Sequence, residues 1–316
     1  MKKFISVFTA MFIFLFSSGV LAAEFSDVKS GDWYYQSISA LTSQGYLNGY
    51  GNGTFKPNAK INRAEFATIL AKASGDSLTD HSSSFDDVPS NHWGYNYIGW
   101  ALDKGITSGK GNNKFCPDDT ITRQEMVTMI YRYKNYKGQA PAITGEPYYS
   151  DFASVADYAK DPLRALYSYG GISGIGNNTF APNATATRAE AAQIIYNCLI
   201  LNDRQRTTVF ARNFVDFKYV SGGASPEAGF DAEGFVKYVY AHFGVSLSGS
   251  VNEFMTVGSE VSRNNLNMGD MVCFILATTN LFMPSTAPME WWSLISTQAI
   301  IKAIFSLAGG YLTTEL

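Results

Sequence analysis

The sequence predicts a mainly α-helical protein in which three copies of one helix-loop-helix unit precede a smaller segment of mixed α and β type. The first observation is a glycine-rich turn with a Phe-x-Pro step, which recurs around Phe55, Phe115 and Phe180. The second is an Arg-x-Glu helix start a few residues after each turn, and the third is a change of composition after Leu201. Units that recur at intervals of 60 and 65 residues are supersecondary units whose apolar faces are buried by their neighbours. We therefore expect the three units to pack as one body.

The first helix of each unit is predicted from apolar residues near helical spacing and from the glycine that follows them. Gly45, Gly105 and Gly170 stand where a helix ends, because glycine adopts the left-handed conformation without strain. The apolar residues are Trp33, Ile38, Leu41 and Leu47 in the first unit, Trp93, Tyr97, Ala101 and Leu102 in the second, and Tyr158, Leu163 and Leu166 in the third.

The second helix of each unit opens with a capping box, in which a side chain and a carboxylate satisfy the free backbone amides of the first turn. The three motifs are Asn62-x-x-Glu65, which is the weaker form, Thr122-x-x-Glu125 and Thr187-x-x-Glu190. The predicted buried stripe is Phe66, Ile69 and Leu70, then Met126, Met129 and Ile130, then Ala191, Ile194 and Ile195.

An arginine in the first turn of each second helix opposes the helix macrodipole. Arg63, Arg123 and Arg188 each place a cation where it costs about 0.3–1 kcal/mol. A guanidinium and a helix N-terminus both present N–H donors, so together they favour a carboxylate or phosphate. The alternative is that each arginine pairs with a neighbouring aspartate and only locks the repeats together.

The complete pattern resembles the S-layer homology repeat over roughly residues 24–200. The matching segments are Phe25-Ser26-Asp27-Val28 with Trp33, Phe85-Asp86-Asp87-Val88 with Trp93, and Tyr149-Ser150-Asp151-Phe152 with Tyr158. The resemblance implies a pseudo-threefold bundle whose inter-repeat grooves bind a secondary cell-wall polysaccharide bearing pyruvylated sugars. It implies a ligand-binding role for Arg63, Arg123, Arg188, Asp27, Asp87, Asp151, Trp33 and Trp93. The third copy departs from the pattern at Tyr158, where tryptophan is expected, and at Gly171, where an apolar residue is expected.

The N-terminus predicts secretion. Lys2 and Lys3 precede an apolar run over residues 4–20, and small residues around Ala22 end it, which is the layout of a signal peptide. We expect a signal peptide at 1–23, repeats at 24–76, 84–136 and 148–200, and a protein of the bacterial cell wall or cell surface. No membrane span is expected in the mature chain.

Composition favours carbohydrate or peptide partners. The chain has a formal net charge of −3 and no basic excess, which argues against nucleic acid. Its three cysteines and three histidines match neither a disulfide framework nor a metal-ligand spacing, so we expect no metal and no cofactor.

The segment 210–274 is similar to the NlpC-like, papain-related peptidoglycan endopeptidases. The similarity rests on Tyr219-Val220-Ser221-Gly222-Gly223, on Gly229-Phe230-Asp231-Ala232-Glu233-Gly234-Phe235-Val236, and on Gly269-Asp270-Met271-Val272. In that family a cysteine nucleophile follows the Phe-Asp step, whereas this chain has Ala232, and no histidine follows His242. Cys273 lies in a predicted strand and is no substitute. The resemblance therefore implies a truncated α+β domain without peptidase activity, which contributes at most binding of a peptidoglycan stem peptide.

Two segments beside this domain have their own predictions. Residues 202–212 are expected to form a polar hinge. The tail, 275–316, does not continue the family pattern, and either a shifted reading frame or an apolar membrane anchor accounts for it. The predicted function is non-covalent attachment to the cell wall; the alternative is a wall-anchored γ-D-glutamyl-diaminopimelate endopeptidase whose sequence carries lesions.

Overall fold

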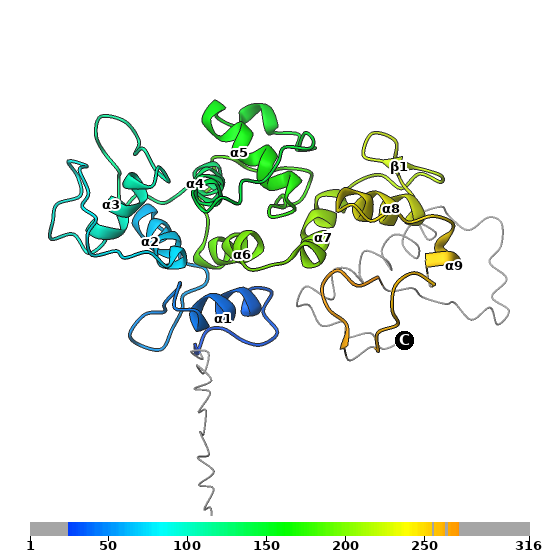
Figure 1. Cartoon of the computed structure of the whole chain (residues 1–316), viewed down its shortest axis with the longest axis horizontal. Coiled ribbons are helices and arrows are strands. Elements are labelled where there is room, and N and C mark those ends of the chain that lie inside the picture. Colours follow the sequence, from blue (N-terminus) through cyan, green and yellow to red (C-terminus); the bar gives the residue numbers. More distant parts are fainter. Residues whose placement is uncertain (1–24, 255, 263–264, 272–316) are drawn as a thin grey trace, which may run out of the picture.

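The computed structural model describes residues 25–254, 256–262 and 265–271, and there it is mainly helical, as the sequence predicts (Figure 1). The signal peptide, Cys273 and the tail from residue 275 lie outside the described residues. Within the described part, no helix is long and apolar enough to cross a membrane.

Each repeat folds as two helices joined by a glycine-rich loop. The first helices are α1 (Tyr35–Ser43), α3 (Tyr95–Asp103) and α5 (Asp157–Ser168), the last preceded by a short 3-10 helix, Phe152–Ser154. The second helices are α2 (Arg63–Ser74), α4 (Arg123–Tyr136) and α6 (Arg188–Leu199).

The helix ends form as predicted. All three capping boxes are complete, and the asparagine version at Asn62 closes as fully as the threonine versions. Gly45, Gly105 and Gly170 each follow a first helix with a positive φ near 70°. The predicted apolar stripe of the second helices is buried throughout. Local sequence therefore determines where the second helices begin and which face they bury.

The tryptophans of the first helices differ from the prediction. Trp33 and Trp93 precede their helices and are 49% and 55% exposed, and Tyr158 is 51% exposed. The inward faces of α1 and α3 are filled instead by residues such as Ile38 and Ile98. The large rings consequently lie outside the core, on the surface between repeats.

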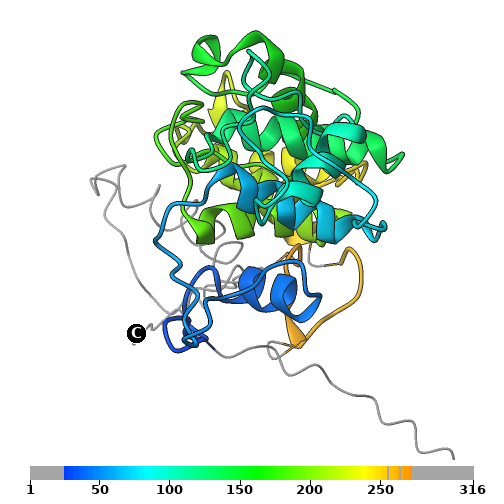
Figure 2. The same cartoon turned by 90° about the vertical axis from the view of Figure 1, so that its left-hand side faces the viewer.

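The three repeats close into a ring. Helix α2 packs against α3, α4 against α5, and α6 against α1, so the last repeat returns to the first. The residues before each second helix meet at the centre in the bridges Lys60↔Thr187, Asn62↔Thr120 and Thr122↔Thr185. Figures 1 and 2 show the helix pairs arranged around this centre.

The remaining described residues, 202–271, form the C-terminal unit. Helix α7 (Asp203–Ala211) leads through a 3-10 helix, Arg212–Phe214, to a small antiparallel hairpin of β1 (Ala224–Ser225) and β2 (Gly229–Phe230). Helices α8 (Ala232–His242) and α9 (Val251–Phe254) follow. In Figure 1 this unit extends from α6 to the side of the ring.

The predicted hinge at residues 202–212 is wrong, because this segment is the buried helix α7. Asn202 caps it with a complete capping box. Arg206 is buried, donates from Nε to the carbonyl of Tyr169 at 2.9 Å, and lies 3.6 Å from the centre of the Tyr169 ring. The polar residues that suggested a flexible linker hold α7 on the third repeat instead.

Asn213 joins the C-terminal unit to the third repeat. Its Oδ1 accepts a hydrogen bond from the Tyr149 hydroxyl at 2.7 Å and from the Gly174 amide at 3.2 Å. Its Nδ2 donates to the Ile172 carbonyl at 3.2 Å. The first two repeats have phenylalanine where the third has Tyr149, so this hydroxyl is specific to the repeat that receives the C-terminal unit.

Two glycines of the third repeat also fit this contact. A Cβ on Gly170 would lie 2.7 Å from the Phe243 ring, and a Cβ on Gly171 would lie 2.7 Å from Cys198 Sγ. The equivalent glycines Gly45 and Gly105 have open space around them. Glycine stands at 171, where an apolar residue was expected, because a side chain there would collide with Cys198 inside the third repeat. Glycine at 170 leaves room for the Phe243 ring at the end of α8.

His242 completes the contact. Its Nε2 donates to the Ser168 carbonyl at 2.7 Å, and its ring stacks on Phe210 with 3.7 Å between centroids. Burial holds the pKa of His242 below its usual value, although the hydrogen bond to Ser168 acts in the opposite direction. The half-buried imidazole thus contributes a hydrogen bond and a stacked ring to this interface.

Removing one hydroxyl tests the importance of this interface. Tyr149→Phe should lower the free energy of unfolding by about 1–2 kcal/mol, because a buried hydrogen bond to Asn213 is lost without a change in packing. Denaturant unfolding measures the change. Tyr148→Phe is the matched control, because its hydroxyl bonds the exposed Glu227 carboxylate, and it should cost clearly less. Equal losses in the two variants would contradict the buried role of Tyr149.

Candidate functional site

Each of the three arginines reaches from one repeat into the loop of the next. Arg63, Arg123 and Arg188 are only 3%, 6% and 4% exposed as whole residues. Their Nε atoms donate to the carbonyls of Phe115 at 2.8 Å, Phe180 at 2.7 Å and Phe55 at 3.0 Å, respectively. Each guanidinium also lies over the ring of the same phenylalanine. The first repeat thus holds the second, the second holds the third, and the third holds the first.

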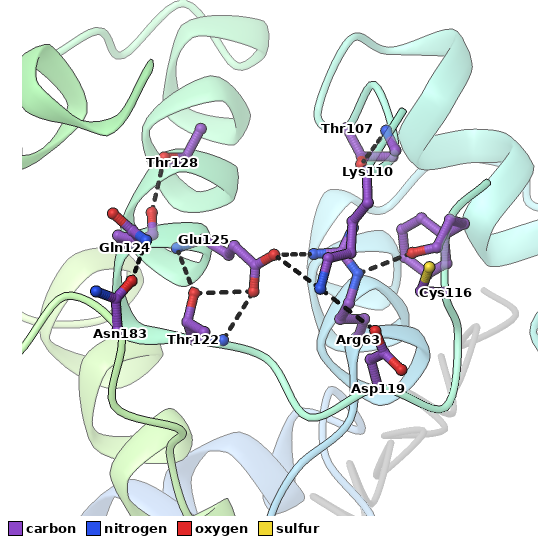
Figure 3. A network of polar contacts seen from close by, with 12 residues as sticks. Arg63, Thr107, Lys110, Cys116, Asp119, Thr122, Gln124, Glu125, Thr128 and Asn183 are labelled. Carbon is purple, nitrogen blue, oxygen red and sulfur yellow. Dashed lines mark hydrogen bonds and ion pairs between the residues drawn. The ribbon is translucent and has the colours of Figure 1, made fainter. Parts of the chain in front are cut away.

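The charge of the arginine is balanced differently in the three places. Arg63 Nη1 lies 2.9 Å from Glu125 Oε1, while the other Glu125 oxygen closes the capping box of α4 (Figure 3). Arg188 pairs with Glu65 at 3.3 Å in the same way. Arg123 has no carboxylate at ion-pair distance among the described residues; its Nη2 donates to the Ser173 carbonyl at 3.0 Å, and burial lowers its pKa.

This geometry supplies the interlocking role that the sequence left open as the alternative. The acidic partners are the glutamates of the neighbouring capping boxes, supplemented by backbone carbonyls. Much of the donor capacity of the guanidinium groups is therefore used inside the protein. Their role in binding an external anion stays a prediction.

The three aspartates organise the loops. Asp27 accepts from the amides of Phe55 and Lys56, each at 2.8 Å. Asp87 does the same for Phe115 and Cys116, and Asp151 for Phe180 and Ala181. The second residue of each pair has a positive φ of 56° or 57° although it is not glycine. The carboxylates thus stabilise a strained step, and both of their oxygens are engaged within the repeat.

The pKa values of two aspartates reflect these bonds. Partial burial alone would raise the pKa of Asp27 and Asp87, but the hydrogen bonds from the loop amides outweigh it and lower both pKa values. Stability from these carboxylates is therefore complete above their ordinary pKa and is lost as the pH falls through the lowered values.

A hollow of about 260 Å³ lies between α2 and α3, which we call the first groove. It brings together the predicted site residues Trp93 and Arg188, which come from the second and third repeats. Lys72, Tyr97 and Glu65 lie beside them. The full lining is Tyr46, Leu47, Asn48, Glu65, Thr68, Ile69, Lys72, Trp93, Tyr97 and Arg188.

The repeat places equivalent side chains at two further helix pairs. By the internal repeat, the equivalent residues are Arg63 and Tyr158 at the α4–α5 contact, which we call the second groove, and Arg123 and Trp33 at the α6–α1 contact, which we call the third groove. Burial raises the pKa of Tyr158, with Glu125 adding to the increase and with Arg63 and Arg132 opposing it, so these charges surround its ring. None of the three predicted aspartates is among the described residues that line the first groove.

Sequence reasoning missed a second cation. Lys72 follows Arg63 by nine residues, and the equivalent positions after the other arginines are Arg132 and Asn197. The first and second grooves therefore carry a second positive side chain, whereas the third carries a neutral amide. Comparing the residue nine positions after each repeat arginine could have identified this second cation from the sequence.

Ala232 lies where the peptidase resemblance expects a nucleophile. It begins α8, whose first turn is capped by Asp231 Oδ1 accepting from the Gly234 amide at 2.7 Å. Asp231 Oδ2 also accepts from the Gly222 amide at 2.8 Å. The helix start that would carry the nucleophile is therefore formed, but its first residue has a methyl group, and Glu233 beside it pairs with Lys237.

Cysteines and acidic residues form no metal site in the described residues, since no group of three or more potential ligands gathers there. Cys198 is buried, and burial raises the pKa of its thiol to about 12. Cys198 is consequently a buried packing residue of α6 and not a nucleophile.

Comparison with known proteins confirms both resemblances. The S-layer homology domain matches residues 24–67, 84–127 and 148–192, and the NlpC/P60 family matches residues 216–281.

Relatives share the repeats inside larger proteins. The chain is 35% identical to an amylopullulanase of Thermoanaerobacterium thermosulfurigenes over 55% of this chain and 9% of that protein. It is 31% identical to the S-layer protein EA1 of Bacillus anthracis over 61% of this chain and 22% of that protein. It is also 31% identical to a cellulosome-anchoring protein of Acetivibrio thermocellus over 49% of this chain and 35% of that protein. The chain thus spans about a third or less of the length of these relatives.

Replacing one loop carboxylate tests its structural role. Asp87→Ala should lower the free energy of unfolding by about 1–3 kcal/mol, because two amides lose their acceptor at a strained step. Thermal or denaturant unfolding at pH 7 measures it, with Asp118→Ala as a control of equal charge on an exposed residue. The gap between wild type and Asp87→Ala should narrow as the pH falls below 3.8, and a gap independent of pH would exclude the ionised carboxylate as its source.

Proposed function

We propose that this chain, which carries three S-layer homology repeats and an NlpC/P60-type segment, attaches non-covalently to the bacterial cell wall by binding an acidic wall polysaccharide. The observation that carries the proposal is the first groove, where the exposed ring of Trp93 lies with Lys72 and Arg188 around one hollow. Two of the relatives, an S-layer protein and a cellulosome-anchoring protein, support a place at the cell surface. A chain acting there is secreted, which agrees with the predicted signal peptide.

The lining of the groove suits an acidic sugar. An indole face packs against the C–H face of a pyranose ring, and Trp93 is 55% exposed although His92 stacks on its ring with 5.4 Å between centroids. Lys72 supplies a positive charge at the groove wall, and Arg188 supplies another at its base, partly balanced by Glu65. A carboxylate on the sugar, such as a pyruvate ketal, would meet the excess positive charge.

The number of positive side chains determines which grooves we expect to bind acidic sugars. The first and second have an arginine, its glutamate partner and a further cation, Lys72 or Arg132. The third has Arg123 and Glu190 with the neutral Asn197 in place of that cation. Acidic sugars are therefore assigned to the first and second grooves, with the third contributing Trp33 as a stacking surface.

The NlpC/P60-type segment is proposed to lack peptidase activity. Cysteine peptidases of this kind need a thiolate and a histidine base, and the chain has Ala232 and no histidine after His242. Any contribution to stem-peptide binding is non-covalent.

Two substitutions in the first groove test wall binding. Trp93→Ala should weaken retention on purified cell walls about tenfold, because the stacking face is removed from a side chain that is not part of the core. Lys72→Ala should weaken retention and also reduce its dependence on salt, because one screened charge interaction is lost. Wall-pelleting titrations at several salt concentrations measure both effects.

Matched variants separate binding from folding. Trp33→Ala removes the equivalent ring of the third groove and should affect retention of acidic polymer less than Trp93→Ala. Lys29→Ala removes an exposed cation outside the grooves and should leave retention unchanged. If Trp93→Ala and Lys72→Ala both retain full binding while remaining folded, the groove is not the wall-binding site.

The absence of peptidase activity is tested directly. The purified chain should cleave a γ-D-glutamyl-diaminopimelate peptide no faster than a buffer blank, and Ala232→Cys alone should not change this, since no histidine base follows. Mass spectrometry of the products measures cleavage, with an intact endopeptidase of the family as positive control. Cleavage by the unmodified chain would overturn the assignment.

A further inference from the structure

A second hollow, of about 430 Å³, lies where the first repeat meets the C-terminal unit; we call it the junction cleft. Its walls come from α1, from α6, from the start of α7 and from residues 266–268. Figures 1 and 2 both show the segment after α9 beside α1. Neither the repeats alone nor the C-terminal unit alone would form this cleft.

The chemistry of the junction cleft is polar but uncharged. Hydroxyl and amide side chains line it, and no Asp, Glu, Lys or Arg is among the described residues of its lining. The polar members are Tyr35, Gln36, Ser39, Tyr196, Gln205 and Asn267. Leu266 and Met268 add apolar contact surface. The first groove, with Arg188, Glu65 and Lys72, is of the opposite character.

Several of these polar groups have unused bonding capacity. In the part of the chain that the structure describes, the side chains of Tyr35, Gln36, Ser39 and Tyr196 make no hydrogen bond to the protein. Tyr196 is half-buried, and this burial raises its pKa. Tyr35, Ser39 and Tyr196 are half-buried whereas Gln36 is exposed, so the three half-buried hydroxyls favour a ligand that supplies hydrogen-bond partners.

The cleft is held open by fixed contacts on both sides. Asn213, Arg206 and His242 hold the C-terminal unit on the third repeat. The segment that forms the far wall is itself anchored, because the Gly269 amide donates to Thr208 Oγ1 at 3.1 Å and Asp270 pairs with Arg204. The walls therefore belong to one body, and a ligand would find the site preformed.

We infer that the junction cleft binds a neutral saccharide segment of the wall polymer. Sugar hydroxyls both donate and accept, which matches hydroxyl and amide side chains, while sugar C–H faces match the rings of Tyr35 and Tyr196. A peptidoglycan stem peptide is a poorer match, because its carboxylates and amine would meet no opposite charge in this lining.

The location supports one continuous path for the polymer. Helices α1 and α6 form the third groove and also contribute two walls of the cleft. A chain lying along the third groove, where no second cation is present, would thus continue between the repeats and the C-terminal unit. This inference rests on the proposed function, since it assumes that the repeats bind a wall polysaccharide.

The test uses the full chain and two forms of purified wall polysaccharide, one native and one with its acidic groups removed. Wild type should bind the neutral form with an affinity that changes less than about twofold between low and high salt, because no charge is involved. The double variant Gln36→Ala with Tyr196→Ala should weaken binding of the neutral form at least tenfold. Isothermal titration calorimetry measures both.

Two controls make the result specific. Gln44→Ala removes an exposed amide from the end of α1 outside the cleft and should leave neutral binding unchanged. Tyr196→Phe keeps the ring and removes the hydroxyl, so it should lose less affinity than Tyr196→Ala if the ring stacks on sugar. Thermal unfolding confirms that each variant is folded.

The outcomes distinguish the inference from the proposed function. Binding of the native form with no binding of the neutral form overturns the junction cleft as a saccharide site and leaves wall attachment intact. Neutral binding that survives the double variant, or a stem peptide binding there in its place, also overturns the inference. Failure of wild type to bind either form overturns the proposed function itself.

Discussion

The structure depends on one hydrogen bond made three times, from the Nε of an arginine to the carbonyl of the phenylalanine in the next repeat's Phe-x-Pro step. No single repeat has enough core to be stable alone, so the repeats must be held in one relative orientation. A guanidinium at a helix start is electrostatically unfavourable. Here carbonyl oxygens, an aromatic face and, for Arg63 and Arg188, a glutamate compensate it. Closing the ring with Arg188 makes every repeat both donor and acceptor of this contact.

Ring closure also creates the first groove and the equivalent positions at the two other contacts between repeats. Each groove needs a second helix from one repeat, a first helix from the next and the arginine of the repeat before. Large aromatic residues at the start of the first helices are excluded from the core by smaller apolar side chains and so line these grooves. The grooves then differ through a few side chains, such as Lys72, Arg132 and Asn197, that the ring itself does not need.

The third repeat shows how a repeat adapts to a further neighbour. Tyr149 adds a hydroxyl to a position that is phenylalanine elsewhere, and Asn213 bonds it along with the backbone of the Ile172–Gly174 loop. The carbonyl in the middle of that loop accepts Arg123, so the C-terminal unit supports the same loop that receives the arginine. The NlpC/P60-type segment is thereby a fixed extension of the ring. Its missing nucleophile leaves that structural role untouched.

Local patterns in the sequence determined the helical repeats, the capping boxes at Asn62, Thr122 and Thr187, the glycine stops and the buried stripe, because each depends on neighbours within a few residues. The sequence also showed directly that position 232 is alanine and has no thiol. Tertiary structure alone decided that the loop aspartates bind backbone amides, that Trp33 and Trp93 face solvent, and that residues 202–212 form a buried helix. Those outcomes depend on partners 28 to 37 residues away or in another repeat, such as Phe55 for Asp27 and Tyr169 for Arg206. The identity of one residue does not show which distant group will be its hydrogen-bond partner.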